Sequence, residues 1–267
     1  MKATLLRGLR KSHSMPRPAL ATLAILVTLA SILHAATTRL TWAEFPALPP
    51  SAGQSRQPGV ASPFVGVHGN ELLVAGGANF PDKMPWDGGA KIWWDDIWVL
   101  EKTADGAAKW VEGKPARLPR RLGYGASVST PEGVVCIGGS DAERCFADVF
   151  LLAWDAAARE VRSTPLPPLP EPLANMAAAL VGRTIYVASG QHVMKGAVPT
   201  SVFWSLDLAQ RDRPAEFRWR VLPAWPGPAR VLPVAAGQRT ARGEEFFLFS
   251  GRVPQAGGRT ELLSDAY

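Results

Sequence analysis

A short phrase recurs four times along this 267-residue chain: an apolar run that ends in a small residue and a glycine. Successive copies are 62, 51 and 61 residues apart, counted from the final glycine. A period of this length, built from short strands, favours a β-propeller over a helical solenoid. The copies are LLVAGG (Leu72–Gly77), VVCIGG (Val134–Gly139), IYVASG (Ile185–Gly190) and FFLFSG (Phe246–Gly251).

The first 36 residues are typical of a secretory signal peptide rather than of the fold. Five basic residues precede the apolar run Ala19–Leu33, and Ala35 and Ala36 follow it. Fifteen apolar residues are fewer than the roughly 20 that a membrane span needs. The sequence therefore predicts export to the periplasm or secretion, with residues 37–267 as the folded domain. Because Leu33 and His34 make a poor cleavage site, an uncleaved anchor is the alternative.

The excess of positive charge lies mostly in this leader. The chain has 29 basic and 23 acidic residues, and the leader holds five of the basic ones and none of the acidic ones. The remaining 24 basic and 23 acidic residues nearly balance. The predicted mature domain therefore offers no electrostatic case for binding nucleic acid.

Both cysteines, Cys136 and Cys145, lie in the second repeat on either side of its glycine doublet. They are placed to face each other across an antiparallel pair, and export would permit a disulfide. The alternative is two buried, small thiols.

Each repeat divides into strand candidates separated by tight turns and closed by proline-rich links. Polyproline recognition segments are the other interpretation of those links, Pro165–Pro172 and Pro223–Pro228, but their position after each fourth strand favours plain connectors. The first two repeats predict strands at Phe64–His68, Leu72–Ala75, Asp96–Leu100, Lys109–Glu112, Leu122–Thr130, Gly133–Ile137, Phe146–Ala153 and Arg159–Ser163. The last two predict strands at Met176–Val181, Thr184–Ala188, Val202–Leu208, Phe217–Leu222, Val231–Ala236, Glu245–Phe249 and Leu263–Tyr267.

In a radial array of such units, the turns after the doublets and the links after each fourth strand share one face. The polar residues in these segments should therefore converge at one end of the central axis. Several arginines there would suit an anionic ligand, because guanidinium binds carboxylates with two hydrogen bonds. For any one arginine the alternative is pairing with a neighbouring acid. The predicted binding residues are Arg121, Arg144, Arg230, Arg252, Asn79, Asn175 and Gln191.

The longest insertion, Asn79–Trp94, carries three tryptophans whose faces could stack on a sugar ring. Packing between blades explains them equally well. Trp86 is expected to be the exposed one, because Pro85 and Gly88-Gly89 hold it in a turn.

Metal and nucleophile chemistry find little support in the sequence. Only His68 and His192 follow the leader, fewer than a copper oxidase on a propeller would need. No metal or phosphate-loop motif is present.

These features together resemble a known family. The glycine doublets and a tryptophan ahead of Leu-Pro resemble kelch repeats. The phrase Ala75–Lys91 (AGGANFPDKMPWDGGAK), with Leu118–Gly125 (LPRRLGYG) and Gly138–Phe146, is similar to the cyclically permuted mutarotases, relatives of N-acetylneuraminate epimerase. The match runs from about Thr41 to Tyr267.

The resemblance implies a closed, six-bladed kelch-type propeller, of which this chain supplies about four blades. A lone outer strand (Leu40–Phe45) would precede them. The chain is thus expected to be a C-terminally truncated member, an open arc that leaves edges exposed; closure by a second chain is the alternative. The Gly-Glu…Pro-Gly-x-Arg phrase associated with catalysis in the family is absent, and the nearest matches are Ser250-Gly251-Arg252 and Ser189-Gly190-Gln191.

The implied function is a sugar mutarotase or epimerase that acts on a sialic-acid-like substrate and needs no cofactor. Ring opening and closure require an acid and a base. The local candidates are Glu143 and Asp141, with His192 as an alternative. Arg121, Arg230 and Arg252 would hold the substrate carboxylate, and Asn79, Asn175 and Gln191 its hydroxyls. The competing hypotheses are a non-catalytic kelch module that binds a glycan or protein, and a fragment without function.

Overall fold

The computed structural model describes residues 42–51, 53–103, 106–112, 116–196 and 198–267, of which Phe45–Tyr267 form one compact unit. The predicted signal peptide, residues 1–36, lies outside the described residues, as does the start of the predicted outer strand, Leu40 and Thr41. The described remainder of that strand, residues 42–45, has no strand pairing. In the described part of the chain, no helix is both long and apolar enough to cross a membrane.

Three consecutive antiparallel meanders form the first three blades. The first contains β1 (Phe64–His68), β2 (Glu71–Ala75), β5 (Asp96–Lys102) and β6 (Ala108–Trp110), with β7 (Ala116–Arg117) also paired to β5. The second contains β8 (Ala126–Thr130), β9 (Gly133–Ile137), β10 (Val149–Asp155) and β11 (Glu160–Leu166). The third contains β12 (Ala177–Val181), β13 (Thr184–Ala188), β14 (Phe203–Asp207) and β15 (Arg220–Val221).

The fourth blade is smaller. It contains the hairpin β16 (Val234–Thr240) and β17 (Gly243–Phe249). The predicted third strand at Leu263–Tyr267 is not a regular strand, but Leu248 and Tyr267 exchange both backbone hydrogen bonds, at 3.0 and 2.9 Å. This segment therefore occupies the third-strand position beside β17. A short hairpin, β18 (Arg252–Pro254) with β19 (Thr260–Leu262), connects the two.

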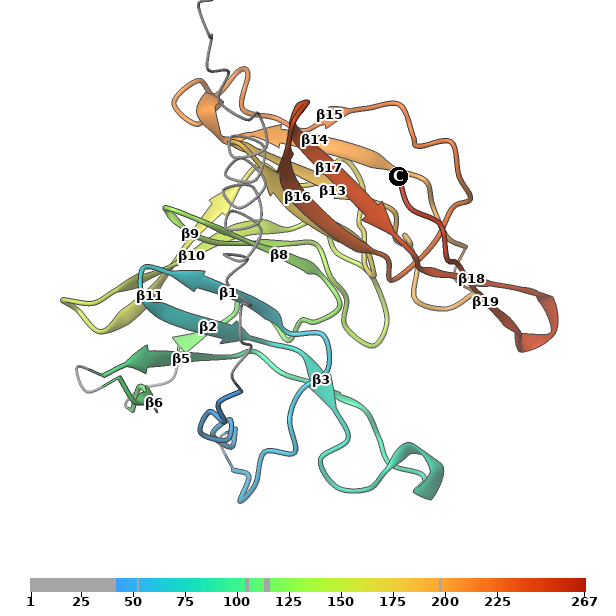
Figure 1. The fold of residues 1–267 in the computed structure, drawn as a ribbon. Helices are drawn as coiled ribbons and strands as arrows, with labels where there is room; N and C mark the ends of the chain where they lie inside the picture. The colour runs from blue at the N-terminus through green and yellow to red at the C-terminus, as the bar shows by residue number, and fades with distance from the viewer. Residues whose placement is uncertain (1–41, 52, 104–105, 113–115, 197) are drawn as a thin grey trace, which may run out of the picture. The chain divides into compact units, whose positions relative to one another are not determined.

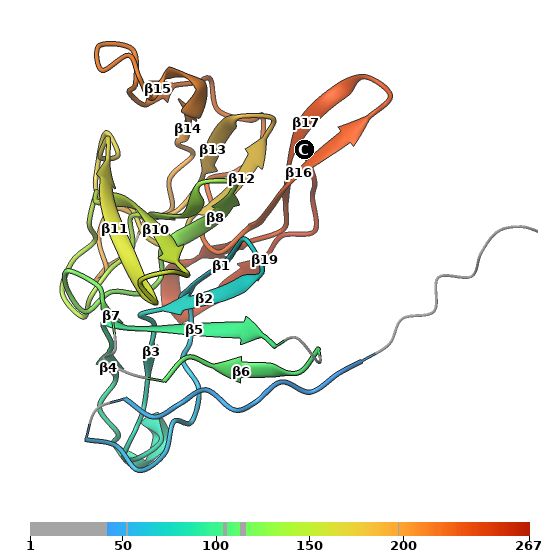
Figure 2. The ribbon, with the colours of Figure 1, turned by 90° about the vertical axis from the view of Figure 1, so that its left-hand side faces the viewer.

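The four sheets follow one another around a common axis (Figure 1). Their first strands lie side by side in the order β1, β8, β12, β16, and the same succession of sheets is visible from the second direction (Figure 2). This is the radial arrangement of a propeller with about four blades in an open arc, as the sequence predicts.

Burial on both faces explains why the repeated phrase is a continuous apolar run. All five residues of β9 are buried. Val134 and Cys136 pack with the first blade in one core cluster, whereas Val135 and Ile137 pack with the third blade in another. Since successive side chains of a strand point to opposite faces, both sets must be apolar when each face meets a neighbouring blade.

Two-residue turns connect the first and second strands of each blade and fix their register. His68 pairs with Glu71, Thr130 with Gly133, and Val181 with Thr184. The predicted tight turns are confirmed at all three places. Gly69 and Gly182 have φ of 64° and 60°, which glycine adopts without the steric cost that a Cβ imposes.

Strand ends differ from the prediction where the backbone leaves the extended region. The second blade's first strand begins at Ala126 rather than Leu122, because Tyr124 has a left-handed φ of 61°. The proline-rich links are connectors, and Pro165 lies in β11 opposite Phe150. Proline is tolerated there because β11 is the outermost strand and pairs on one side only. Helical structure among the described residues is limited to three short 3₁₀ turns: η1 (Pro85–Asp87), η2 (Leu208–Gln210) and η3 (Ala256–Gly258).

Candidate functional site

The four doublets share one backbone conformation, and the first three of them tie their blade to the next. Both residues of every doublet have positive φ, for example 65° at Gly76 and 91° at Gly77. The backbone N–H of Gly77 donates to the carbonyl of Leu122, just before the second blade, at 2.8 Å. Gly139 and Gly190 make the corresponding bonds to Leu173 and Arg230, at 2.8 and 3.0 Å. The end of one blade's second strand is therefore fixed beside the start of the following blade.

A second line of hydrogen bonds links the residues just before each first strand. Tyr124 donates its backbone N–H to the carbonyl of Ser62 at 3.0 Å, and Asn175 donates to Tyr124 at 2.8 Å. Leu232 continues the line by donating to Asn175 at 2.8 Å. All four residues have left-handed φ, between 50° and 61°. Equivalent positions of four blades, up to 170 residues apart, are thus brought together at one end of the axis.

Segments after the doublets pair with segments before the first strands. Single antiparallel bridges join Gly123 to Ser140, Ala174 to Gln191, and Val231 to Arg252. The predicted convergence of these two sets of loops is confirmed. We call this region the axial end: residues 61–63, 78–79, 91–94, 121–125, 140–145, 174–175, 191–192, 230–232 and 252.

A cation-aromatic cluster is the most distinctive feature of the axial end. Lys91 Nζ donates a hydrogen bond to Tyr124 Oη, and it lies 4.3 Å from the centroid of the Tyr124 ring and 5.2 Å from that of Trp93. The two rings are 6.2 Å apart. Lys91 directly precedes β4 (Ile92–Trp93), which pairs with β3 (Ala78–Asn79) at the base of the long insertion. The insertion therefore delivers a cation to the start of the second blade.

Sequence reasoning did not single out Lys91. The signal was available, because Lys91 is the last residue of the phrase on which the family resemblance rests. A lysine in a polar loop has no periodicity that distinguishes it from a solvated surface charge.

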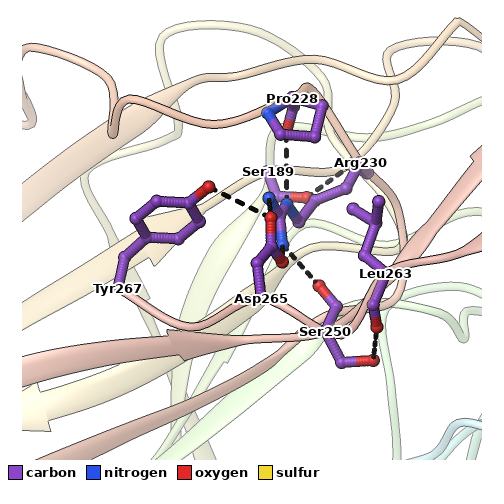
Figure 3. A network of polar contacts seen from close by, with 7 residues as sticks. All are labelled: Ser189, Pro228, Arg230, Ser250, Leu263, Asp265 and Tyr267. Atoms are coloured by element: carbon purple, nitrogen blue, oxygen red, sulfur yellow. Dashed lines mark hydrogen bonds and ion pairs between the residues drawn. The ribbon is translucent and has the colours of Figure 1, made fainter.

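Arg230 was predicted to hold a substrate carboxylate, and the structure corrects this. Its side chain is fully buried and forms a two-pronged ion pair with Asp265, Nη1–Oδ1 at 2.5 Å and Nη2–Oδ2 at 2.8 Å (Figure 3). Its Nε and Nη1 also donate to the carbonyls of Pro228 and Ser250, at 3.1 and 2.7 Å. Its donors are used within the protein, so Arg230 fastens the fourth blade rather than facing a ligand.

The ion pair shifts the pKa of both partners. The hydrogen bond from Arg230 lowers the pKa of the Asp265 carboxyl below its usual value, and the hydroxyl of Tyr267 contributes by donating to Oδ2 at 3.0 Å. The pKa of Arg230 is raised, mainly by the hydrogen bond to Asp265. Both groups are therefore charged across the neutral range.

Asn79 was predicted to bind a substrate hydroxyl, but its amide is already occupied. Nδ2 donates to Gln57 Oε1 at 2.8 Å and to the carbonyl of Gly59 at 2.7 Å, and Oδ1 accepts the indole N–H of Trp94 at 2.8 Å. Only 9% of the residue is exposed. The amide holds the base of the insertion against the segment that precedes the first blade.

Gln191, predicted for the same role, is also buried. Its Nε2 donates to the carbonyl of Val193 at 2.9 Å and contacts the Met194 sulfur at 3.6 Å. Its side chain thus shapes its own loop. Asn175 is half-buried at the axial end, and no hydrogen bond of its side-chain amide is formed within the described residues.

The two predicted catalytic carboxylates differ. Asp141 Oδ1 accepts the backbone N–H groups of Glu143 and Arg144, at 2.8 and 2.9 Å, so it caps the turn that follows the second doublet. Glu143 lies in that turn with an exposed side chain. Of the two carboxylates, only that of Glu143 does not cap the turn. His192 Nδ1 donates to the carbonyl of Pro172 at 2.9 Å, and its Nε2 lies 3.5 Å from a carboxylate oxygen of Glu171.

Comparison with known proteins shows which family the chain matches. Residues 27–161, half of the chain, match the N-acetylneuraminate epimerase family. The chain belongs to the N-acetylneuraminate epimerase family. The matched stretch contains the first doublet, the insertion, Lys91, Tyr124 and the Asp141 turn.

Individual relatives cover part of the chain only. A Brucella melitensis protein named N-acetylneuraminate epimerase is 39% identical over 132 residues, which are 46% of this chain and 32% of that protein. A Vibrio vulnificus protein of the same name is 37% identical over 112 residues, or 39% of this chain and 27% of that protein. The matched segment thus spans about a third of the length of these relatives.

The fold extends the likeness beyond the matched sequence. The solved structure of YjhT superposes with a TM-score of 0.53 at 13% identity, covering 76% of this chain and 64% of that one. At this identity the likeness shows the fold alone, a kelch-type propeller. The third and fourth blades of this family member are recognisable in the structure although they lie outside the stretch that matches the family.

Four further predicted binding residues are exposed. Trp86 is 78% exposed in η1, as expected from its turn. Arg121 and Arg252 are exposed beside Tyr124 and Val231, and the structure gives their guanidinium groups no ion pair within the described residues. Arg144 is exposed too, with its guanidinium carbon 5.0 Å from the centroid of the Phe146 ring. Arg230 is therefore no longer a candidate binding residue, but the axial end still presents three arginines and Lys91.

The disulfide considered for Cys136 and Cys145 is not formed, and both are free, buried thiols. Cys136 lies opposite Phe150 in the sheet and packs toward the first blade. Cys145 Sγ contacts the carbonyl of Gln191 in the third blade at 3.5 Å. The two side chains thus serve different blade interfaces. Burial raises the pKa of both thiols, that of Cys145 to about 11 with a contribution from Asp141.

Proposed function

We propose that this protein is an exported sialic-acid mutarotase or epimerase whose substrate binds at the axial end of the propeller arc. The observation that carries the proposal is the family match over the stretch that builds the Lys91–Tyr124 cluster. The relatives named N-acetylneuraminate epimerase support the substrate class. The basic residues at the axial end support an anionic sugar, since Arg121, Arg144 and Arg252 remain accessible there.

The proposed chemistry is proton transfer at the anomeric centre. A base removes the proton of the anomeric hydroxyl, the bond from the anomeric carbon to the ring oxygen breaks as the carbonyl forms, and an acid protonates the ring oxygen. Reclosure on the other face of the carbonyl gives the other anomer. Glu143 is the residue of this chain that we assign to one of these proton transfers, because its carboxylate is exposed at the axial end while that of Asp141 caps a turn.

Export is the second part of the proposal and rests on the sequence of residues 1–36. A basic start, an apolar run and small residues are in the order of a secretory signal. Expression with and without these residues, followed by fractionation of periplasm and cytoplasm, tests it. Export of the full chain but not of the variant lacking residues 1–36 is expected, and equal distribution of both would contradict it.

Exchange NMR of N-acetylneuraminate tests the enzymatic claim. Cross-peaks between the α and β anomers should build up faster with the protein than with buffer. The variant Glu143→Gln should slow the exchange by about 10²-fold or more, as expected for loss of a general acid or base. Glu132→Gln, in the turn at the opposite end of the second blade, is the matched control and should behave like wild type. No acceleration by the wild-type protein would reject the claim.

A non-catalytic glycan-binding module is the second candidate. The turn-capping role of Asp141 favours it, because it leaves Glu143 without its predicted partner acid or base. This hypothesis predicts that N-acetylneuraminate binds while the anomer exchange rate is unchanged.

A further inference from the structure

We propose that Lys91 and Tyr124, flanked by Trp93, form the subsite that recognises the carboxylate of the sugar acid. This inference rests on the proposed function. It adds which group of the substrate is recognised and which residues bind that group. Neither Lys91 nor Tyr124 was among the binding residues predicted from the sequence.

The hydrogen-bonding capacity of the pair fits a carboxylate. A lysine ammonium has three N–H donors, and the structure assigns one of them to Tyr124 Oη. Because the phenol oxygen accepts from the lysine, its own proton is left to donate elsewhere. An ammonium and a phenol that are held together in this way can both donate to one carboxylate, with charge-assisted bonds from the lysine.

The charge balance around Lys91 points the same way. Some cations of the described structure have carboxylate partners, as Arg117 has Asp95, Arg159 has Glu101 and Arg230 has Asp265, whereas the exposed arginines at the axial end do not. No carboxylate of the described residues lies within ion-pair distance of Lys91 Nζ. Yet Lys91 is only partly exposed, with its ammonium against two aromatic rings. A partly desolvated cation without a counter-ion favours an incoming anion.

The pair is also held rigidly before any ligand arrives. Tyr124 has a left-handed φ of 61° and is fixed on both sides of its backbone, by the carbonyl of Ser62 and the N–H of Asn175. Lys91 is placed by the β3–β4 pairing, and Asn79 and Trp94 lock that pairing with a side-chain hydrogen bond. Donors that need little reorganisation on binding lose less affinity to conformational entropy.

The position of the subsite matches the rest of the axial end. Arg121 lies three residues before Tyr124 in the same segment, and Asn175 is hydrogen-bonded to Tyr124 through the backbone. A sugar whose carboxylate meets Lys91 would therefore have its ring near polar residues of the second and third blades.

Three ligands separate recognition of the carboxylate from recognition of the sugar. Titration calorimetry of the full-length protein uses N-acetylneuraminate, its methyl ester, and acetate as a carboxylate without a sugar. Wild type should bind the acid more tightly than the ester, by a factor on the order of ten or more, because the neutral ester cannot form an ion pair with the Lys91 ammonium and its carbonyl is a weaker acceptor than a carboxylate. Lys91→Gln should bind the acid as weakly as the ester, and its affinity for the ester should not change.

Two further variants and one control exclude a merely structural effect. Lys91→Arg keeps the charge and should retain most of the preference for the acid, and Tyr124→Phe should lose part of it. Lys102→Gln, an exposed lysine at the far end of β5, should bind like wild type. Each variant's unfolding transition is compared with that of wild type, so that a folding defect is recognised.

The outcomes separate the subsite from the function. Equal affinity of wild type and Lys91→Gln for the acid overturns the subsite and leaves the proposed function standing. Shifts of the Tyr124 ring resonances on adding acetate, lost in Lys91→Gln, support the subsite even when no sugar binds, and that result counts against the function instead. If neither acetate nor N-acetylneuraminate shifts the Tyr124 ring resonances, the subsite proposal is overturned.

Discussion

Asp265, the third-last residue of the sequence, holds the fully buried guanidinium of Arg230 with both of its carboxylate oxygens, at 2.5 and 2.8 Å. The pair joins the segment before the first strand of the fourth blade to the segment that lies beside β17. The rings of Trp225 and Tyr267 lie against the guanidinium, with centroids 5.6 and 5.4 Å from its central carbon. A residue that looked like a ligand contact in the sequence is thus the fastening of the last blade.

Removing one partner of this pair should destabilise the protein. Asp265→Asn leaves a buried guanidinium without its charge partner. The expected loss of unfolding free energy is about 2–3 kcal/mol, below the usual loss for breaking a fully buried pair because Asp265 is itself 31% exposed. Urea unfolding measures it. The double variant Arg230→Met/Asp265→Leu should recover part of the loss, and a variant Asp265→Asn as stable as wild type would contradict the role.

The same pair predicts how stability depends on pH. The pKa of Asp265 is lowered in the folded protein, chiefly by the hydrogen bond from Arg230. The ionised Asp265 carboxylate therefore contributes to the free energy of unfolding at pH values above the unfolded carboxyl pKa of about 3.9. This contribution is lost as the pH falls through the lower pKa of the folded state. The difference in unfolding free energy between wild type and Asp265→Asn should be constant near neutral pH and shrink in acid. A difference that grows in acid would show that the sign is wrong.

The first glycine of the first doublet should not tolerate a side chain. A Cβ at Gly76 would lie 2.2 Å from the carbonyl oxygen of Leu122 in the next blade. Gly257, in η3, is the matched control: it has a similar positive φ, 76° against 65°, but nothing lies within 4 Å of its Cβ position. Both alanine variants incur the strain of about 1 kcal/mol or more of a left-handed residue. Only Gly76→Ala should lose substantially more stability than that in thermal unfolding, and equal losses would contradict the inter-blade contact.

The two thiols should react slowly in the native protein. The pKa of Cys145 is raised to about 11 and that of Cys136 is raised well above its usual range, in both cases mainly by burial. Because the thiolate is the reactive form, little of it is present at pH 8. Titration with a disulfide reagent should find almost no rapid reaction in the folded state and two thiols after unfolding. A count of zero after unfolding would instead indicate a disulfide.

The strands could be predicted because their apolar runs are continuous, and the runs are continuous because neighbouring blades cover both faces. β9 and β13 begin and end at the residues expected from the sequence. The doublets located the axial end correctly, since their left-handed backbone is what brings the segments together. The left-handed residues Tyr124 and Leu232 were not foreseen, and the first strands of the second and fourth blades were consequently predicted to begin too early, whereas β1 begins at the expected residue.

The roles of single side chains were predicted less well, for a physical reason. The sequence places Arg230 and Asn79 in the converging segments, but it does not show that Asp265, Gln57 and Trp94 come from far along the chain to occupy their donors and acceptors. Burial is decided by such distant partners. Lys91 was overlooked for the converse reason: its contact with Tyr124 joins residues 33 positions apart that neither periodicity nor composition connects.

Hydrogen-exchange mass spectrometry with N-acetylneuraminate tests the central claim most directly, because it shows where on the propeller arc the sugar binds. The account predicts slower exchange in peptides that contain Lys91–Trp94, Arg121–Gly125 and Asp141–Cys145. A groove between the outer strands of the first two blades, lined by Trp98, Trp110, Trp154 and Arg159, should exchange unchanged. Protection confined to that groove, with none at the axial end, would contradict the account.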